Sequence, residues 1–462
     1  MTKVIDRIGA VIKNYQPTFS VRFSLAYALL FVALAGDAVR YTIGWIGWAV
    51  AIGILVLGSG WQFFSNQPMK TLRRIPLTLY ALLALMITST LWSNYPTFTL
   101  IGFAAQIATT VTALFLVSRF DWRELLRLFA NVIRVILVLS FALEFYSAAI
   151  VKGPIAPIFK NFTGDVPVSG AYYWVQAHLF TGQRIQGIVG NATLLGYIAM
   201  LGVILFAVEF LIHRTNRWFL AFSIAMAFGA MVLSKSAGVF FAVIGVVATA
   251  IVAGIAEGRP RDFRHKLYRV SWVVAFMAVF YMLQYRDAIF EFVGKSPDAS
   301  GRGHIWYEVS KLIARRPVQG WGWIGYWMPG AKPLDHLVRV EGVQQYHAHD
   351  AYLDVTMQLG IIGLLLFLTM LALSFVKLWR LAVRTQNPLY LWPLLVFSGI
   401  LVLNITESRM LVENGWMIIV LFMVKVNEPE ELLEPSSHSV PMMTHIWRRV
   451  KPALVSLRLI RA

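Results

Sequence analysis

Long apolar segments constrain this chain more than any other feature. A helix needs about 20 mostly apolar residues to cross the hydrocarbon layer of a bilayer. About twelve segments are apolar over nearly that length, and none shows the strict alternation of a barrel strand. We therefore predict an all-α, polytopic membrane protein with about twelve transmembrane helices. The predicted spans are residues 20–36, 41–58, 76–92, 99–118, 127–150, 190–212, 218–233, 238–255, 268–285, 351–376, 389–403 and 411–424.

The composition agrees with this class. Hydrophobic residues make up 58% of the 462 positions and charged residues only 14%. Soluble domains carry about 45 to 50% apolar and about 25% charged residues, so the balance excludes a soluble enzyme and a disordered chain. Cysteine is absent, which removes disulfides, thiolate metal sites and cysteine nucleophiles.

Lysine and arginine are concentrated in alternate loops. The short turns on one side hold only Arg40, Lys235 and Arg409, whereas the segments on the opposite side each carry several basic residues. The positive-inside rule therefore predicts that both termini are cytoplasmic. The net charge of +18 then reflects topology and attraction to anionic lipid, and no nucleic-acid partner is predicted. The basic cytoplasmic segments begin with Lys3, Arg7, Lys13 and Arg22.

Two outer loops are much longer than the others, at residues 151–189 and 286–349. Loops longer than about 12 to 15 residues are usually functional or disordered, and the aromatic content of these two argues against disorder. We therefore expect any chemistry there. The chain divides into a membrane domain over 1–426, which includes the large loop, and a cytoplasmic tail over 427–462 that lies on the membrane surface.

The long loops contain arginines and histidines that suit an anionic ligand. Arg184 lies in the first loop, Arg302 and Arg316 lie in the second, and His349 lies just before the tenth span. The guanidinium fork matches phosphate oxygens, and imidazole is the side chain that titrates nearest neutrality. The residues predict a diphosphate headgroup at the outer leaflet, although Arg184 and Arg302 also fit interfacial residues that extend toward water.

Other polar and aromatic residues nearby have two interpretations. Trp306 and Trp323 would form a platform for sugar rings or an interfacial aromatic belt. Asp354, one turn into the tenth span, would orient an acceptor, and His347 would assist it. His347 and His349 have a spacing seen in some metal sites, but without cysteine or a clear carboxylate triad no metal is predicted.

One spacing in the chain is distinctive. His349 and Asp350 are followed, after nine residues, by Gly360 and then by Gly363. This pattern resembles the motif of the O-antigen ligase and polysaccharide polymerase superfamily of bacterial envelopes. Supporting matches are Gly301, Arg302 and Trp306; Arg316, Pro317, Gly320 and Gly322; Arg184, Gly187 and Asn191; and Leu91, Trp92 and Ser93.

The resemblance implies glycosyl transfer in the cytoplasmic (inner) membrane without a nucleotide sugar, metal or other cofactor. A glycan on an undecaprenyl-diphosphate carrier would pass to a glycan or lipid acceptor hydroxyl on the outer side. His349 would be the general base or would orient the acceptor, while Arg184 and Arg302 would hold the diphosphate. The superfamily usually has an amide or hydroxyl residue in place of Asp350. An acidic residue there would either favour protonated His349 or bind the acceptor.

Two other classes of protein remain open at this stage. A polysaccharide or lipid-glycan transporter or flippase also has about twelve spans, but such proteins usually show internal repeats and ligand groups near the midplane. No repeat is evident, and the polar candidates gather at one membrane surface. A non-enzymatic envelope assembly protein is the second alternative. Ligase and polymerase share donor chemistry, so these residues do not separate them.

Overall fold

The computed structural model describes residues 20–158, 170–212, 216–285, 302–340 and 342–429, together with residues 288 and 433. Several predicted features lie outside these residues. They are the basic N-terminal positions Lys3, Arg7 and Lys13, Arg214 of a loop that is predicted to be cytoplasmic, the loop residue Gly301 and most of the tail that follows residue 429.

Each predicted span coincides with a helix. By length and composition, α3, α6, α7 with its π-helical extension, α8, α10 and α14 are able to cross a membrane. The chain is thus an all-α polytopic membrane protein, as predicted, and the count of about twelve spans stays a prediction. The helices at the predicted spans are α2 (Val21–Leu34), α3 (Gly36–Phe64), α5 (Leu77–Thr88), α6 (Pro96–Arg119), α7 (Trp122–Phe145), α8 (Ala192–Ile212), α9 (Arg217–Leu233), α10 (Ala237–Ala256), α11 (Arg261–Gln284), α14 (Ala351–Thr385), α15 (Leu391–Leu403) and α16 (Glu413–Lys425).

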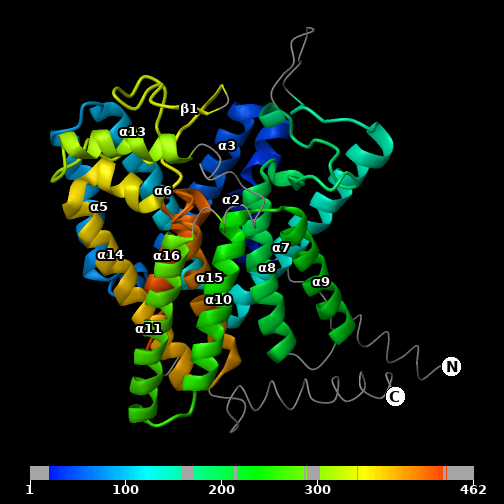
Figure 1. Ribbon diagram of the computed structural model, residues 1–462, viewed down its shortest axis with the longest axis vertical. Helices are drawn as coiled ribbons and strands as arrows, with labels where there is room; N and C mark the ends of the chain where they lie inside the picture. Colours follow the sequence, from blue (N-terminus) through cyan, green and yellow to red (C-terminus); the bar gives the residue numbers. More distant parts are fainter. Residues whose placement is uncertain are drawn as a thin grey trace.

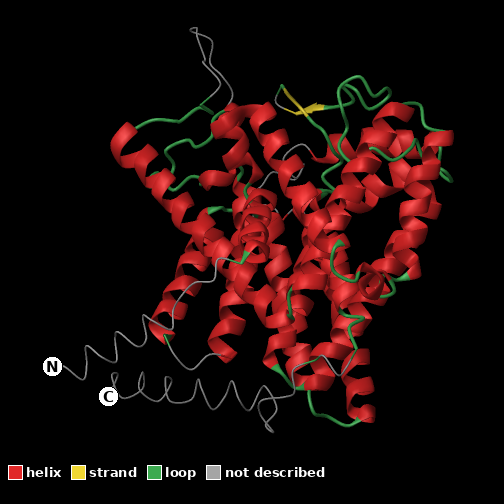
Figure 2. Cartoon of the chain, turned by 180° about the vertical axis from the view of Figure 1, so that it is seen from behind, coloured by secondary structure: helices red, strands yellow, loops and turns green. Residues whose placement is uncertain are grey.

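Short elements connect these helices. They are α4 (Pro68–Leu72), α13 (Arg302–Arg315), the antiparallel strands β1 (Arg339–Val340) and β2 (Val343–Gln344), and the short helices η1 (Ser89–Leu91), η2 (Tyr146–Val151), η3 (Gly170–Tyr172), η4 (Gly187–Val189), η5 (Pro388–Tyr390) and η6 (Arg409–Leu411). Helix α13 lies across one end of the bundle, where β1 also lies (Figure 1). From behind, the two strands and many of the longer loops are again at that end (Figure 2). We call it the loop end.

The bundle is packed around α8, α15 and α16. Their side chains are almost fully buried, and large aromatic residues fill the space between them, as apolar burial in a closely packed interior requires. Examples are Phe206, Phe397, Trp416 and Phe422. Helix α11, by contrast, has no buried residue among those whose burial is described, so it lies at the periphery. The buried helices therefore form the fixed support on which the loop end is built.

A break in α14 joins the second long loop to the bundle. Gly360 has φ +67 and ψ −170, a conformation that essentially only glycine adopts. The break frees helix carbonyls, and the backbone N–H groups of Trp321 and Gly322 donate to Met357 at 3.0 Å and Gln358 at 2.9 Å. In return, the N–H of Ile361 donates to a loop carbonyl. Glycine at position 360 therefore allows the loop backbone to form hydrogen bonds with the backbone of α14 at the break.

The loop end also has a small core of its own. Ile305, Val309 and Leu312 of α13 are buried against Trp321 and Trp327 from the following loop. This cluster is separate from the main bundle core, which lets α13 hold the loop as a compact unit. The arrangement fixes the position of Arg302 at the start of α13 and of the histidines just before α14.

Candidate functional site

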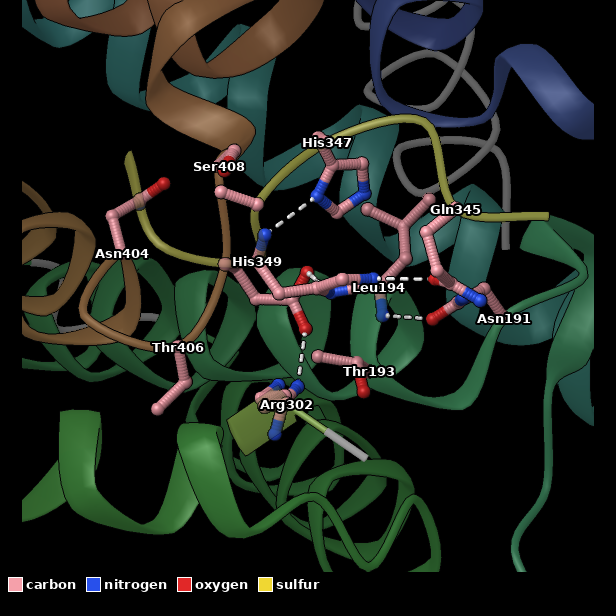
Figure 3. A network of polar contacts seen from close by, with 12 residues as sticks. Asn191, Thr193, Leu194, Arg302, Gln345, His347, His349, Asn404, Thr406 and Ser408 are labelled. Atoms are coloured by element: carbon pink, nitrogen blue, oxygen red, sulfur yellow. Dashed lines mark hydrogen bonds and ion pairs between the residues drawn. The ribbon is translucent and has the colours of Figure 1, made fainter. Parts of the chain in front are cut away.

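His349 lies in a strained turn immediately before α14. Its φ is +51, which is unusual for a residue with a side chain, and its backbone N–H donates to Nδ1 of His347 at 3.1 Å. The two imidazole centroids are 3.9 Å apart. Nε2 of His349 lies 3.0 Å from Oε1 of Gln345, whereas Nδ1 is buried and has no hydrogen-bond partner among the described residues. Figure 3 shows this turn.

Glu407 approaches His349 from the turn between α15 and η6. Its Oε1 accepts a hydrogen bond from Nη2 of Arg302 at 3.0 Å, and its Oε2 lies 3.6 Å from Nδ1 of His349. The second separation is an ion-pair distance, longer than a hydrogen bond. Burial alone would raise the pKa of the Glu407 carboxyl, but His349 and the guanidinium groups of Arg302 and Arg409 outweigh burial and lower that pKa. Glu407 is therefore a carboxylate that links His349 and Arg302.

Two further arginines add positive charge. Arg184 donates through Nε to the carbonyl of Ser234 at 3.0 Å and through Nη2 to the hydroxyl of Thr193 at 3.1 Å. Burial lowers the pKa of Arg184, and the charge of Arg302 lowers it further. Burial would lower the pKa of Arg409, but nearby Tyr326 and Glu407 raise it on balance.

We call Arg184, Arg302, His349, Glu407 and Arg409 the outer cluster. Its members come from the first long loop, α13, the turn before α14 and the turn before α16. The cluster holds three arginines and one carboxylate, of which Arg302 and Glu407 are in contact, so its formal charge is positive. The prediction that two separate loops bring arginines to the same region as His349 therefore agrees with the geometry, and the roles of these residues stay proposals.

Asp354 connects the segments around the outer cluster through hydrogen bonds. Its side chain is fully buried, Oδ1 accepts from the indole N–H of Trp327 at 3.0 Å, and Oδ2 accepts from the backbone N–H of Ala348 at 2.9 Å and from the hydroxyl of Ser408. It thus joins the aromatic loop, the histidine turn and the Glu407 turn. Because its oxygens are occupied by protein donors, the geometry supports a positioning role and not the predicted contact with an acceptor.

Asp350 and Trp306 also have structural partners. Oδ1 of Asp350 caps α14 by accepting from the N–H groups of Tyr352 and Leu353, both at 2.9 Å. The indole N–H of Trp306 donates to the carbonyl of Ala348 at 3.1 Å. Both residues therefore hold the turn that presents His349, and a catalytic part for Asp350 or a sugar contact for Trp306 stays a prediction.

Arg316 and Trp323 do not join the outer cluster. Arg316 follows the end of α13 whereas Arg302 begins it, and a 14-residue helix is about 21 Å long. Arg316 instead donates to the carbonyl of Trp92 at 3.1 Å and stacks 4.3 Å above the ring of Trp321. Trp323 is fully buried, so it has no free ring face for a sugar. For both residues the geometry supports packing and not the predicted ligand contacts.

His347, His349 and Glu407 offer donor atoms that all lie within 4.8 Å of one another. The carboxylate that seemed to be missing from a metal site is thus supplied by a distant turn. However, Glu407 is already paired with Arg302, and Arg409 adds a second positive charge nearby. Repulsion from two guanidinium groups disfavours a cation here, so the arrangement suits an anion better.

Glu407 and Arg409 are the main residues that the sequence interpretation missed. Arg409 was noted only as a basic residue in an outer turn, and Glu407 was not singled out. The sequence does show a short turn with two charged residues between two strongly apolar segments, and this turn is predicted to lie on the same side of the membrane as His349. Charged residues in such a turn, next to a candidate base, indicate a functional site.

Comparisons with known proteins identify the family that this chain resembles. Residues 185–368 match the family model described as O-antigen ligase. The exopolysaccharide production protein ExoQ of Rhizobium meliloti (strain 1021) is 24% identical over 311 residues. That match covers 64% of this chain and 64% of the relative's length. The resemblance drawn from the motifs is thus confirmed, and the matched family segment contains Arg302, His349 and the break at Gly360.

Proposed function

Because its central part, residues 185–368, belongs to the O-antigen ligase family, we propose that this chain is a membrane glycosyltransferase. It transfers a glycan from an undecaprenyl-diphosphate carrier to an acceptor hydroxyl on the outer side of the cytoplasmic membrane. The single observation that carries this proposal is the outer cluster, in which Nδ1 of His349 is buried, has no hydrogen-bond partner among the described residues, and lies 3.6 Å from the carboxylate of Glu407, which also pairs with Arg302.

The arginines bind the leaving group in this scheme. When the bond between the anomeric carbon and the phosphate oxygen breaks, the lipid diphosphate departs with the electron pair and gains negative charge. Arg184 and Arg302 stabilise that charge through charge-assisted hydrogen bonds. Arg302 is held by Glu407 at 3.0 Å, so it is already oriented before the donor binds. Preorganised donors of this kind lower the barrier because they need not rearrange during the reaction.

His349 accepts the proton of the attacking hydroxyl. Its Nδ1 is the ring nitrogen without a hydrogen bond among the described residues, and buried polar atoms normally have a partner. The acceptor hydroxyl supplies that partner, its oxygen attacks the anomeric carbon, and its proton moves to Nδ1. The resulting imidazolium is stabilised by the carboxylate of Glu407, which orients His349 and balances its charge.

The experiment uses the purified full-length protein in liposomes with an undecaprenyl-diphosphate-linked oligosaccharide as donor. We expect a longer or newly attached glycan together with an equal amount of free undecaprenyl diphosphate. A transporter or flippase would move the donor between leaflets without breaking the glycosidic bond, and an assembly protein would do neither. Intact donor after prolonged incubation with each acceptor class, a glycan and a lipid, would therefore refute transferase activity.

A further inference from the structure

A pocket of about 610 Å³ lies between the first long loop and the start of α8, beside the outer cluster. We call it the loop pocket. Its walls are unusually rich in amides and cations: Gln176, Gln183, Gln186, Asn191, Arg184 and Lys235 all contribute. No aspartate or glutamate is among the described residues that line it. Its volume falls in the range of roughly 300 to 1,000 Å³ that is typical of small-molecule sites.

The amides indicate a ligand with many hydroxyl groups. Oε1 of Gln186 is buried and has no hydrogen-bond partner among the described residues, although Gln186 lines the pocket. An amide oxygen in this state needs a donor, and a sugar hydroxyl supplies one. Gln183 is exposed at the pocket wall and offers both a donor and an acceptor. A diphosphate presents acceptors only, so it would leave the amide oxygens of this pocket unsatisfied.

The cations indicate that the ligand is negatively charged. Lys235 lies at the outer turn and donates to the carbonyl of Gly182, which fixes its ammonium group at the pocket. The guanidinium of Arg184 forms part of the same wall. The nearest buried acid, Glu144, is fully enclosed and accepts the backbone N–H groups of Gln186 at 2.7 Å and Gly187 at 2.8 Å. It therefore holds the loop backbone and leaves the pocket wall positive.

The loop pocket adjoins the proposed reaction site. Thr193 lines the pocket and accepts a hydrogen bond from Arg184, a member of the outer cluster. Asn191 and Thr193 are grouped with Arg302 and His349 in the polar network of Figure 3. A ligand in the pocket would therefore lie next to the groups that we assign to the diphosphate and to the proton transfer.

We propose that the loop pocket binds a sugar residue of the transferred glycan or of the acceptor glycan, and that it prefers a sugar bearing a carboxylate. This inference rests on the proposed function for its place in the reaction, and it names the substrate class as an acidic polysaccharide. Hydroxyls of the sugar contact Gln183 and Gln186, while its carboxylate pairs with Lys235.

Binding of two simple sugars tests the proposal without requiring transfer. Methyl β-glucuronide and methyl β-glucoside differ only in whether C6 is a carboxylate or a hydroxymethyl group. We would titrate each into the full-length protein in nanodiscs, which avoid sugar-headed detergents, and measure affinity by saturation-transfer NMR. Since a charge-assisted hydrogen bond is roughly twice as strong as a neutral one, we expect the glucuronide to bind about 10-fold more tightly.

Three variants test which residues cause the preference for the glucuronide. Lys235→Gln should remove most of the preference for the glucuronide while leaving glucoside affinity unchanged. Gln183→Glu should weaken glucuronide binding about 10-fold, because it places a like charge on the wall. The matched control is Lys152→Gln, since Lys152 is also an exposed lysine with positive φ; it lies in the first long loop and does not line the pocket.

Equal affinity of the wild-type protein for the two sugars, or an unchanged preference in Lys235→Gln, would overturn the proposal. The outcomes also distinguish failure of the sugar-pocket proposal from failure of the proposed transferase function. If the protein prefers the glucuronide but never cleaves a lipid-linked donor, the proposed transferase function is wrong and the anionic sugar pocket stands. If it transfers glycans without any sugar preference at this pocket, the reverse holds.

Discussion

Replacing Glu407 by glutamine tests how the outer cluster works, because the substitution keeps the shape and removes the charge. Glu407 is 5% exposed. Its Oε1 accepts a hydrogen bond from Nη2 of Arg302 at 3.0 Å, and its Oε2 lies 3.6 Å from Nδ1 of His349. The account assigns it two tasks, to orient Arg302 for the diphosphate and to stabilise protonated His349. Both tasks require a negative charge, so the neutral amide should fail at each.

The magnitude follows from these distances. Two unit charges about 4 Å apart interact by about 4 kcal/mol at an effective dielectric constant of about 20. His349 is 23% exposed in its side chain, so water weakens this value, and we expect a loss of roughly 3 kcal/mol in the transition state. That corresponds to a decrease in kcat of about 10²-fold. Breaking the buried pair with Arg302 should also lower the free energy of unfolding by about 3 kcal/mol.

The assay measures donor cleavage by the wild type, Glu407→Gln, His349→Ala and the double variant, with thermal unfolding of each protein. Because Glu407 acts on the proton through His349, that part of its effect should vanish once His349 is absent, so the double variant should be slower than His349→Ala only by the part that comes from the orientation of Arg302. Glu308→Gln is the control, since Glu308 forms a more exposed ion pair with Lys311 and should change kcat less than about twofold. Fully independent effects in the double variant, or near wild-type kcat for Glu407→Gln, would refute the reasoning.

Three further results are expected. Gly360→Ala should lower the free energy of unfolding by at least about 1 to 3 kcal/mol, because φ is +67 and the new Cβ would lie 2.0 Å from a loop carbonyl oxygen. The control is Gly53→Ala, where a new Cβ would meet nothing within 4 Å, and it should leave the free energy of unfolding unchanged in the same measurement. Arg302→Ala should lower kcat/KM for the donor by at least about 10-fold, whereas Arg316→Ala should change the melting temperature and not donor kinetics, and the opposite pattern would contradict the assignment. Burial lowers the pKa of His347 well below 6.5, so its contribution to stability is present above about pH 6.5 and is lost as pH falls; the melting temperature should decrease from pH 7 to 5, and His347→Asn should reduce that slope.

The membrane helices could be predicted from the sequence because apolar length alone determines them. Every predicted span coincides with a helix, and only the ends differ, as where α14 continues to Thr385 beyond the predicted end at residue 376. In the sequence, Gly360 is distinctive only through its spacing from His349, and that spacing does not predict a break in the helix. The break is paired with carbonyl and N–H groups of loop residues that lie about 40 positions earlier in the sequence. Local sequence does not reveal such pairing.

The candidate site could be predicted in part. Arg184, Arg302 and His349 were identified because cations in long outer loops are informative by type and position. Arg316 and Trp323 were misjudged, because residue type does not say which way a side chain points: one stacks on Trp321 and the other is enclosed. Glu407 is 58 positions after His349 and meets it only through the packing of α15 beside α14.

The most direct test of the central claim is the rate of undecaprenyl-diphosphate release by His349→Ala at saturating donor and acceptor. The account assigns proton removal from the acceptor hydroxyl to this imidazole, and general bases contribute about 10² to 10⁴-fold in rate. We therefore expect release to fall by at least about 10²-fold, with unchanged donor binding and a melting temperature close to that of the wild type. Release at the wild-type rate by a correctly folded His349→Ala protein would contradict the account.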